Sequence, residues 1–564
     1  MNDRRPLIAV ALIIVIALAP MLFLKTRKPV TGSAADSTHV AAHDSTPRPA
    51  PVIVPTTAAP PVTVAQAAPA TPERLVVVRS GLYRYVVSST GGRIVSSRIL
   101  HYQSMNPADR RDTLELIRPG SALLAARLVT GNDTVPIDRI AFTPSADSLT
   151  ASTEPATLTL TGTSGAYTVQ LHYLFSPNDY RIYVDGQVTG LGPTGGTLLV
   201  GLGDGFRDTE ASAADNRNFS AFVTKTDKTN LTRFSSLKAQ SVSTVSGPFE
   251  WVAVKSKYFV GAVFAYDSTA QGVTARLGGL LVTVPDTDSH PIKAAVSASL
   301  TVPAQGHFSW SVYLGPMEYD RLSHIGHGFD DVNPYGWTVF RWIVRPCTVA
   351  IRAVFVWMHH VLGVGYGLVI VLFGVAVRLA LWPLYRKQMR ATMAMQAIQP
   401  LITELQERYK EDPAQLNREM MKLYKEHNAN PLSGCWPMLL PYPLLVAVFF
   451  VLAYTIEVRG VPFLWMPDLS RADPLYIIPV LMAVTQLVLA RISQIGMPPN
   501  PQTKMMMYLM PVFMLVIFIR FASGLNLYYA AQNLASLPQQ WALNKERQRA
   551  MAAQTPPPKV QKKK

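Results

Sequence analysis

The sequence contains few charged residues and almost no cysteine. Of its 564 residues, 16% are charged and 49% are hydrophobic, whereas roughly 25% of the residues of a typical soluble domain are charged. This composition argues against a chain that is soluble throughout. Its two cysteines, Cys347 and Cys435, lie in or beside apolar stretches, so the sequence indicates no disulfide framework.

The sequence also lacks the motifs of metal and nucleotide chemistry. No Cys/His spacing of the zinc-binding kind and no G-x-x-x-x-G-K-[ST] loop occurs. There is no Ser-His-Asp order, and the histidines of the long soluble-looking region are scattered. We therefore expect no catalytic residue, no bound metal and no cofactor.

The excess of basic residues indicates an anionic partner. The formal net charge of +16 fits either nucleic acid or a membrane surface. Basic residues gather beside apolar segments, in the N-terminal flank, in residues 385–430 and in the tail 544–564, which favours the membrane. The tail could also contact an RNA-rich partner such as a ribosome, by releasing counterions.

Residues 1–24 predict a transmembrane helix. Arg4 and Arg5 precede an apolar run over residues 7–24, long enough to cross a bilayer core of ~30 Å. The alternative is a cleaved signal peptide, whose apolar region usually has roughly 7–15 residues. Because this run is longer, we favour an uncleaved signal anchor with a cytoplasmic N-terminus. Residues 25–74, rich in Pro, Ala and Thr, predict a disordered linker.

Residues 75–325 predict an antiparallel β-domain. Apolar and polar residues alternate in short runs, for example over 157–163, 167–175 and 180–188, and turn residues separate these runs. This pattern is typical of a β-sandwich. The sequence assigns the domain no activity.

Residues 337–361 interleave arginines with large apolar residues. This composition predicts an amphipathic helix that lies in the membrane interface. The alternative is a helix buried against the β-domain.

Five apolar segments follow within residues 365–543. They cover residues 365–384, 436–456, 475–495, 505–521 and 525–543. The charged stretch 385–430 repeats apolar residues at helical spacing on both sides of Asp412-Pro413, which predicts a helical hairpin with an apolar seam. We place Ile398, Leu401, Ile402, Leu405, Tyr409, Leu416, Met420, Leu423 and Tyr424 in this seam.

The lysines and arginines of the hairpin determine the expected topology. Because such residues concentrate in cytoplasmic loops, the hairpin is predicted to be cytoplasmic. Together with the N-terminal anchor, the apolar segments predict six transmembrane helices. Both termini are then cytoplasmic, and the β-domain lies on the opposite side of the membrane.

Arg378 lies inside the first of the five segments, which contains no acidic residue. A charge at the bilayer centre costs between ~3 and more than ~10 kcal/mol. Two interpretations remain open. The side chain either extends to the interface, or it faces a water-filled cavity that opens to the cytoplasm.

The last segment carries a stripe of polar residues. Asn526, Tyr529, Asn533, Ser536 and Gln540 recur at helical spacing and share one helix face. The alternative is hydrogen bonding between helices, worth ~0.6–2 kcal/mol for each bond. A whole stripe is more than packing needs, so we predict a hydrated groove. Its lining residues are Arg378, Thr485, Gln486, Asn526, Tyr529, Asn533 and Ser536.

Motifs along the helical part resemble those of the YidC family of membrane protein insertases of Gram-negative bacteria. They are VRLALWPLYRKQ at 377–388, MQAIQPLITELQERYKEDP at 395–413, EMMKLYKEHNANPLSGCWPMLL at 419–440, EVRGVPFLWMPDLSRADPLYIIPVLM at 457–482 and MPVFMLVIFIRFASGLNLYY at 510–529. The resemblance is strong over residues 335–545 and weaker over residues 75–325.

The resemblance implies a polytopic α-helical inner-membrane protein with a periplasmic β-supersandwich and a groove open to the cytoplasm and the lipid. Arg378 matches the groove arginine of the family, and Tyr529 matches the second tyrosine of the last helix. Gly374 stands where the family has a polar residue, one turn before the arginine. The implied partners are nascent membrane proteins, the Sec translocon, the ribosome and the lipid bilayer.

We therefore expect a non-enzymatic insertase that helps nascent membrane proteins to insert and fold. Two other classes of protein are the alternatives. A solute transporter predicts repeated halves, and the sequence shows no internal repeat. A membrane-anchored periplasmic binding protein would act through its β-domain.

Overall fold

The computed structural model describes most of the chain from residue 72 to residue 554. The gaps are residues 132, 267–275, 288–289, 334, 337–339, 388–397, 411, 427–441 and 496–500. The predicted N-terminal anchor, nearly all of the linker and the end of the basic tail lie outside the described residues.

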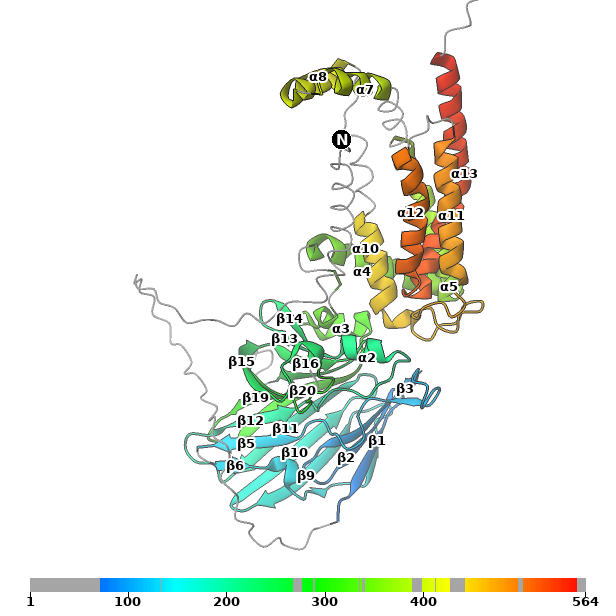
Figure 1. Cartoon of the computed structure of the whole chain (residues 1–564). Helices are drawn as coiled ribbons and strands as arrows, with labels where there is room; N and C mark the ends of the chain where they lie inside the picture. The colour runs from blue at the N-terminus through cyan, green and yellow to red at the C-terminus, as the bar shows by residue number, and fades with distance from the viewer. Residues whose placement is uncertain are drawn as a thin grey trace, which may run out of the picture. The chain divides into compact units, whose positions relative to one another are not determined.

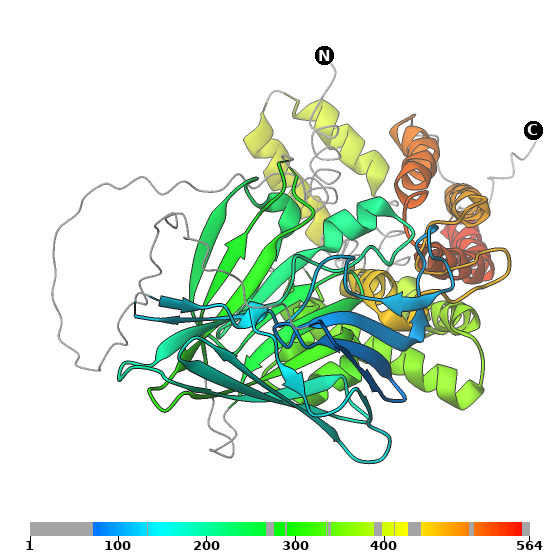
Figure 2. The same cartoon turned by 90° about the horizontal axis from the view of Figure 1, so that it is seen from below.

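The first part of the described chain forms three β-sheets (Figures 1 and 2). The five-stranded sheet has the order β4-β3-β2-β1-β8, with β1 Leu75–Arg79, β2 Tyr83–Ser88, β3 Ile94–Gln103, β4 Thr113–Glu115 and β8 Ser148–Thr150. The six-stranded sheet has the order β15-β18-β19-β12-β5-β6, with β5 Ala126–Thr130, β6 Asp133–Val135, β12 Gly196–Gly201, β15 Val242–Phe249, β18 Leu277–Thr283 and β19 Ala295–Val302.

The third sheet of the β-domain has nine strands. Its order is β14-β13-β16-β17-β20-β11-β10-β9-β7, with β7 Thr143–Pro144, β9 Ala156–Ser164, β10 Tyr167–Phe175, β11 Arg181–Thr189, β13 Ala221–Lys225, β14 Thr229–Arg233, β16 Trp251–Lys255, β17 Phe259–Ala265 and β20 His307–Pro316. Short helical turns connect the strands: η1 Ile137–Arg139, α2 Ala213–Phe219 and η2 Phe234–Ser236.

The strands follow the alternation seen in the sequence. The runs at 157–163, 167–175 and 180–188 fall in β9, β10 and β11, which pair antiparallel. In β10 the side chains of Val169, Leu171, Tyr173 and Phe175 are buried, and the residues that alternate with them are less so, as a half-buried strand requires. The predicted antiparallel β-domain is confirmed; within the described residues, β1 with β8 is the parallel pair.

Side chains of all three sheets enter one hydrophobic core. Strands β16 and β17 differ from β10 because every residue of β16 and nearly every residue of β17 is buried. A strand that is covered on both faces has no reason to alternate, which explains why these two runs are continuously apolar.

A short segment after β20 leads from the β-domain to helix α4, Arg341–Leu362. It contains α3, Tyr319–Ile325, and η3, Phe329–Val332. The arginines of α4 recur at i, i+4 and i+11, so they share one face. Each pairs with a carboxylate of this segment: Arg341 with Asp331 at 3.0 Å, Arg345 with Asp330 at 2.6 Å and Arg352 with Asp320 at 2.9 Å.

The other side of α4 is apolar and exposed. Trp342 and Trp357 are 76% and 60% exposed, although both are large hydrophobic side chains. One face of the helix therefore contacts the acidic residues that follow the β-domain, and the other face is uncovered, as in an amphipathic helix. Its location in the membrane interface stays a prediction.

The remaining helices form the helical core. They are α5 Tyr366–Ala380, α10 Tyr442–Tyr454, α11 Ile477–Gln494, α12 Pro501–Phe518 and α13 Ser523–Gln554, with the turn η4 Ile456–Val458 after α10. α5 packs along α13, α13 along α11, and α11 along α12, whereas α10 packs mainly along α4 (Figure 1). α13 continues past residue 543, where the predicted fifth segment ends, to Gln554.

The predicted hairpin contains two helices, α7 Gln399–Arg408 and α8 Pro413–Glu426. Ile398 and Ile402 are buried against Met420, Leu423 and Tyr424, which confirms this part of the apolar seam. Leu401, which the sequence also places in the seam, is 39% exposed and lies at the rim of a shallow hollow between α7 and α8. The side chain of Asp412 accepts hydrogen bonds from the backbone N–H groups of Ala414 and Gln415 and so begins α8.

Among the described residues, α11 is both long and apolar enough to cross a membrane by itself. α4 and α5 taken together are also long and apolar enough, but the chain bends by 117° at the break between the two helices. Shorter apolar helices cover Pro443–Tyr454 and Met507–Phe518. The structure does not establish the count of six transmembrane helices, which stays a prediction.

A buried lysine lies where the β-domain meets the helical core. Lys255 at the end of β16 is 3% exposed, and its Nζ donates to Asn333 Oδ1 at 3.2 Å. The Nδ2 of Asn333 donates to the carbonyl of Tyr454 at the end of α10. Burial, helped by repulsion from Arg233, lowers the pKa of the Lys255 ammonium to about 7.

This lowered pKa predicts a pH dependence of stability. The unfolded chain binds the proton of Lys255 up to pH 10.5, and the folded chain releases it near pH 7. Stability rises with pH wherever the unfolded state binds more protons. Between pH 7 and pH 10.5, the free energy of unfolding of wild type should therefore rise by roughly 3–5 kcal/mol relative to that of Lys255→Met. Thermal unfolding at successive pH values measures this difference.

Lys228→Met is the matched control, because Lys228 is an exposed lysine on the neighbouring β13–β14 turn. It should keep the wild-type pH profile. Parallel profiles of wild type and Lys255→Met would show that Lys255 is protonated in the folded protein at neutral pH.

Candidate functional site

Arg378 lies near the end of α5 and is partly buried. Its Nε donates to Oε1 of Gln539 on α13 at 2.9 Å, and its guanidinium stands 3.9 Å from the ring centroid of Tyr385. Within the described residues it forms no ion pair. Its charge is therefore stabilised by an amide and an aromatic face, and no carboxylate neutralises it.

Three residues of α13 that the groove prediction omitted face α5. Tyr528 approaches Phe373 of α5, with ring centroids 6.1 Å apart, and its hydroxyl accepts from Nε2 of Gln532 at 2.8 Å. Gln539 binds Arg378. These positions are spaced i, i+4 and i+11, so they share a face of the helix. The same spacing is visible in the sequence as a second polar stripe beside the predicted one.

The predicted stripe lies on a neighbouring face of α13, and part of it contacts other helices. Nδ2 of Asn533 lies 3.4 Å from both Oγ1 of Thr485 and the carbonyl of Met482 on α11. Nδ2 of Asn526 donates to the carbonyl of Phe518 at 3.0 Å, while its Oδ1 is buried with no partner among the described residues. These contacts are of the interhelical kind that was the alternative interpretation.

The other predicted groove residues lie on α11 and α13 and make contacts of their own. The ring of Tyr529 meets the ring of Phe518 edge-on at 5.0 Å. The hydroxyl of Ser536 donates to the carbonyl of Gln532 within the same helix, and Gln486 is half-buried on α11. The structure thus separates the predicted set, with Arg378 on the α5 side of α13, Asn533 against α11, and Asn526 and Tyr529 against α12. A role in a groove remains a prediction for all seven residues.

Gly374 explains how closely α5 approaches α13. A Cβ atom at this position would lie 3.2 Å from the carbonyl oxygen of Tyr528 and 3.4 Å from the Cβ of Ala531. The missing side chain therefore permits direct backbone contact between the helices. Small residues serve the same purpose in other membrane helix pairs.

The arrangement offers binding chemistry. A cation held by uncharged groups can accept an anionic side chain from another molecule, because no carboxylate competes for it. Tyr385 follows Arg378 by seven residues, in the direction of the hairpin. The guanidinium therefore reaches along the chain toward that end of the helix and also bonds to Gln539 of α13.

Known proteins resemble this chain over nearly its whole length. A family model described as the YidC periplasmic domain matches residues 75–349, and one described as the 60Kd inner membrane protein matches residues 357–550. A membrane protein insertase YidC from Chlorobium luteolum is 30% identical over 522 residues, 84% of this chain and 83% of the relative. One from Ralstonia nicotianae is 32% identical over 513 residues, 87% of this chain and 88% of the relative.

A solved structure described as an active YidC insertase crystal structure with the first transmembrane domain resolved is also similar. It is 17% identical, with a TM-score of 0.33, and the match covers 83% of this chain and 94% of that chain.

The close approach at Gly374 predicts a graded response to side-chain size. Gly374→Ala should change stability little, because a better helix former offsets one tight contact. Gly374→Leu should destabilise the core by about 1–3 kcal/mol, since an added large side chain must push α5 from α13. The thermal midpoint of the purified protein in detergent measures both. Equal midpoints for Ala and Leu would contradict the contact.

Proposed function

Because the chain belongs to the YidC family of membrane protein insertases, we propose that its helical core accepts part of a nascent membrane protein beside Arg378. The protein is an insertase of the inner membrane, and nascent membrane proteins are what it acts on. The observation that carries the proposal is the pairing of Arg378 with uncharged partners, Gln539 and Tyr385.

We further propose a topology of six transmembrane helices with the β-domain in the periplasm and both termini in the cytoplasm. The 117° bend between α4 and α5 supports this, because an in-plane helix must turn sharply before a spanning helix. The exposed Trp342 and Trp357 on α4 support the in-plane location, since tryptophan is enriched at membrane interfaces.

In the proposed mechanism, a short polar part of the substrate moves from the cytoplasm into the core. Arg378 and nearby water lower the cost of desolvating that part, above all when it carries an acidic residue. The polar groups of α13 and α11, including Thr485, Gln486 and Asn533, line the path. Transfer of the apolar part of the substrate into lipid drives the step, so no nucleotide is required.

The apolar part of the substrate leaves between α5 and α10 in this proposal. The packing supports that exit, because the described residues of these two helices do not pack along each other. α5 belongs with α13, and α10 belongs with α4.

The hairpin is proposed to meet the substrate first, together with the ribosome, and the Sec translocon is a further proposed partner. Helices α7 and α8 bury only a small seam, and Arg408 is an exposed cation beside it. A basic tail and hairpin suit an RNA-rich surface.

One observation favours the alternative of a binding protein that acts through its β-domain. The β-domain has a polar cavity of about 530 Å³, lined by Arg98, Asp109, Glu115, Arg118 and Arg207 among others. On that view, changing cavity arginines would abolish the function, and Arg378 would be dispensable.

Replacing Arg378 tests the proposal. In Arg378→Ala, insertion of substrates whose translocated segment carries acidic residues should fall about tenfold, which corresponds to ~1.4 kcal/mol. Substrates with uncharged segments should insert nearly as in wild type. Insertion into proteoliposomes, scored by protease protection for paired substrates that differ only in those charges, measures the difference.

Arg520→Ala is the matched control, because Arg520 is an exposed arginine that follows α12. It should insert both substrates like wild type. Equal loss for charged and uncharged substrates in Arg378→Ala would contradict the proposed role, and loss on changing Arg98 and Arg207 with none for Arg378→Ala would favour the binding protein.

A further inference from the structure

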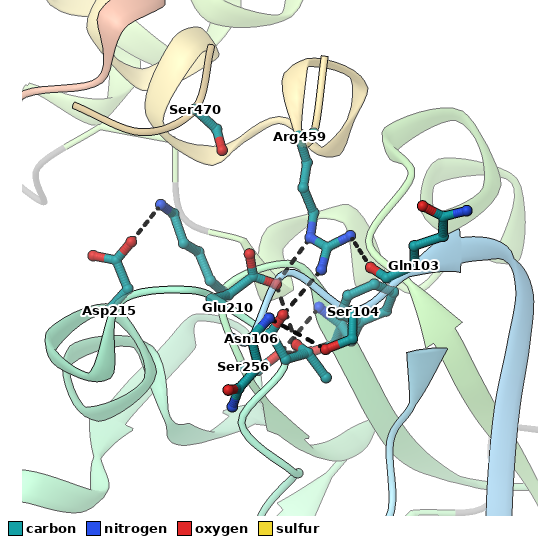
Figure 3. A network of polar contacts seen from close by, with 12 residues as sticks. Gln103, Ser104, Asn106, Glu210, Asp215, Ser256, Arg459 and Ser470 are labelled. Atoms are coloured by element: carbon teal, nitrogen blue, oxygen red, sulfur yellow. Dashed lines mark hydrogen bonds and ion pairs between the residues drawn. The ribbon is translucent and has the colours of Figure 1, made fainter. Parts of the chain in front are cut away.

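The loop of residues 456–473 joins α10 to α11 and reaches into the β-domain. Ile456 packs in the hydrophobic core of that domain, and the charged side chain of Arg459 also enters it. Figure 3 shows Arg459 extending from this loop toward Glu210 and Gln103. The Arg459 side chain is 1% exposed and that of Glu210 is 7% exposed. A charged residue of the helical core is therefore enclosed among residues of the β-domain.

Every group that holds the Arg459 guanidinium comes from the β-domain. Its Nε lies 2.9 Å from Oε1 of Glu210, and its terminal nitrogens donate to the carbonyls of Gln103 at 2.9 Å and Thr209 at 3.3 Å. The ring of Phe259 lies 5.4 Å away. Burial raises the pKa of the Glu210 carboxyl, and the attraction of Arg459 opposes this shift.

Two buried aspartates fix the backbone of the same loop. Oδ1 of Asp468 accepts hydrogen bonds from the N–H groups of Gly460 and Ser470 and from the hydroxyl of Ser470. Asp473 is 0% exposed and accepts from Trp465 Nε1 and from the N–H of Ile478 in the first turn of α11. The loop is therefore held as a unit, so a displacement of Arg459 is passed on to its neighbours in the loop.

The loop in turn contacts the first turns of three helices. The ring of Phe463 fills the space where Gly367 of α5 would carry a Cβ, 2.1 Å from its Cδ2. The N–H of Gly524, in the first turn of α13, donates to the carbonyl of Leu469 at 2.9 Å. Asp473 bonds the first turn of α11, as described. α10 leads directly into the loop, so these four helix ends meet at a single segment.

We propose that Arg459 and Glu210 are positioning residues for membrane insertion. By seating loop 456–473 in the β-domain, the pair sets the spacing of α5, α10, α11 and α13 at this end of the core. The inference rests on the proposed insertion through the helical core, and it assigns the β-domain a task in that process. It concerns the geometry of the helices and is independent of the charge of the substrate.

The chemistry of the pair makes it sensitive to substitution. Arg459 is enclosed with a single carboxylate, so removing Glu210 leaves it buried without a counter-ion. Removing Arg459 leaves the Glu210 carboxylate with only the weaker attraction of Lys257, which already pairs with Asp215. Separation of the loop from the β-domain then lowers the free energy of the protein, because the remaining charge can reach water. Helix ends that the loop holds would become free to separate.

The distance between helix ends tests the proposal directly. Spin labels at Leu368→Cys on α5 and Ile477→Cys on α11 occupy exposed positions, 41% and 44% exposed, in a chain with Cys347 and Cys435 replaced by alanine. In Arg459→Met and Glu210→Gln, the distance distribution between the labels should be broader than in the labelled protein that keeps both Arg459 and Glu210. Insertion of charged and uncharged substrates should fall by the same factor, about fivefold or more.

Arg471→Met is the matched control, because Arg471 is an exposed arginine of the same loop. Its distances and its insertion activity should equal those of wild type. The uniform loss expected here differs from the charge-selective loss expected for Arg378→Ala. Failure of one proposal is therefore distinguishable from failure of the other.

Folding is monitored by the thermal midpoint and by size-exclusion chromatography of each variant. If Arg459→Met does not fold, Arg459→Lys serves instead, since it keeps a charge opposite Glu210 but cannot reproduce the bonds to both carbonyls. Folded variants with an unchanged distance distribution and unchanged insertion would overturn the proposal. Loss of folded protein in all these variants, with Arg471→Met intact, would also overturn it and leave the pair a purely structural role.

Discussion

The cost of burying a charge organises both the β-domain and the helical core. A buried ion needs a counter-ion and hydrogen bonds, because water no longer stabilises it. Arg459 receives both, from Glu210 and two carbonyls. Arg378 receives an amide and an aromatic ring but no carboxylate in the described residues. The first arrangement is complete and suits a fixed joint, whereas the second leaves electrostatic capacity for a ligand.

Helix α4 shows how the same requirement divides a single amphipathic helix. Arg352 is nearly enclosed between Asp320 of the segment after β20 and Glu457 of the loop after α10. The arginine face of α4 thereby connects the segment after the β-domain with the start of loop 456–473. The tryptophans on the other face remain uncovered. One helix thus serves as a polar connector on one side and presents an apolar surface on the other.

Much of the fold could be predicted from the sequence because its signals are local. Alternation over residues 167–175 determines a strand, and Asp412-Pro413 marks the beginning of α8. The partners of Arg378 and Arg459 could not be predicted in this way. Gln539 is 161 residues from Arg378, and Glu210 is 249 residues from Arg459. Which face of α13 meets α5 depends on the small size of Gly374 in α5. The sequence of α13 carries two polar stripes, and its own pattern does not decide between them.

The position of Arg459 in the chain also has a consequence for the order of assembly. Glu210 and its β-domain precede every helix of the core in the sequence, and domains generally fold from the N-terminal side during synthesis. The carboxylate is therefore made long before its arginine. When α10 and loop 456–473 emerge, a folded receptor for Arg459 can already exist. The last helix, α13, then completes the core by bonding to a loop that is already seated, so the protein can template its own membrane assembly.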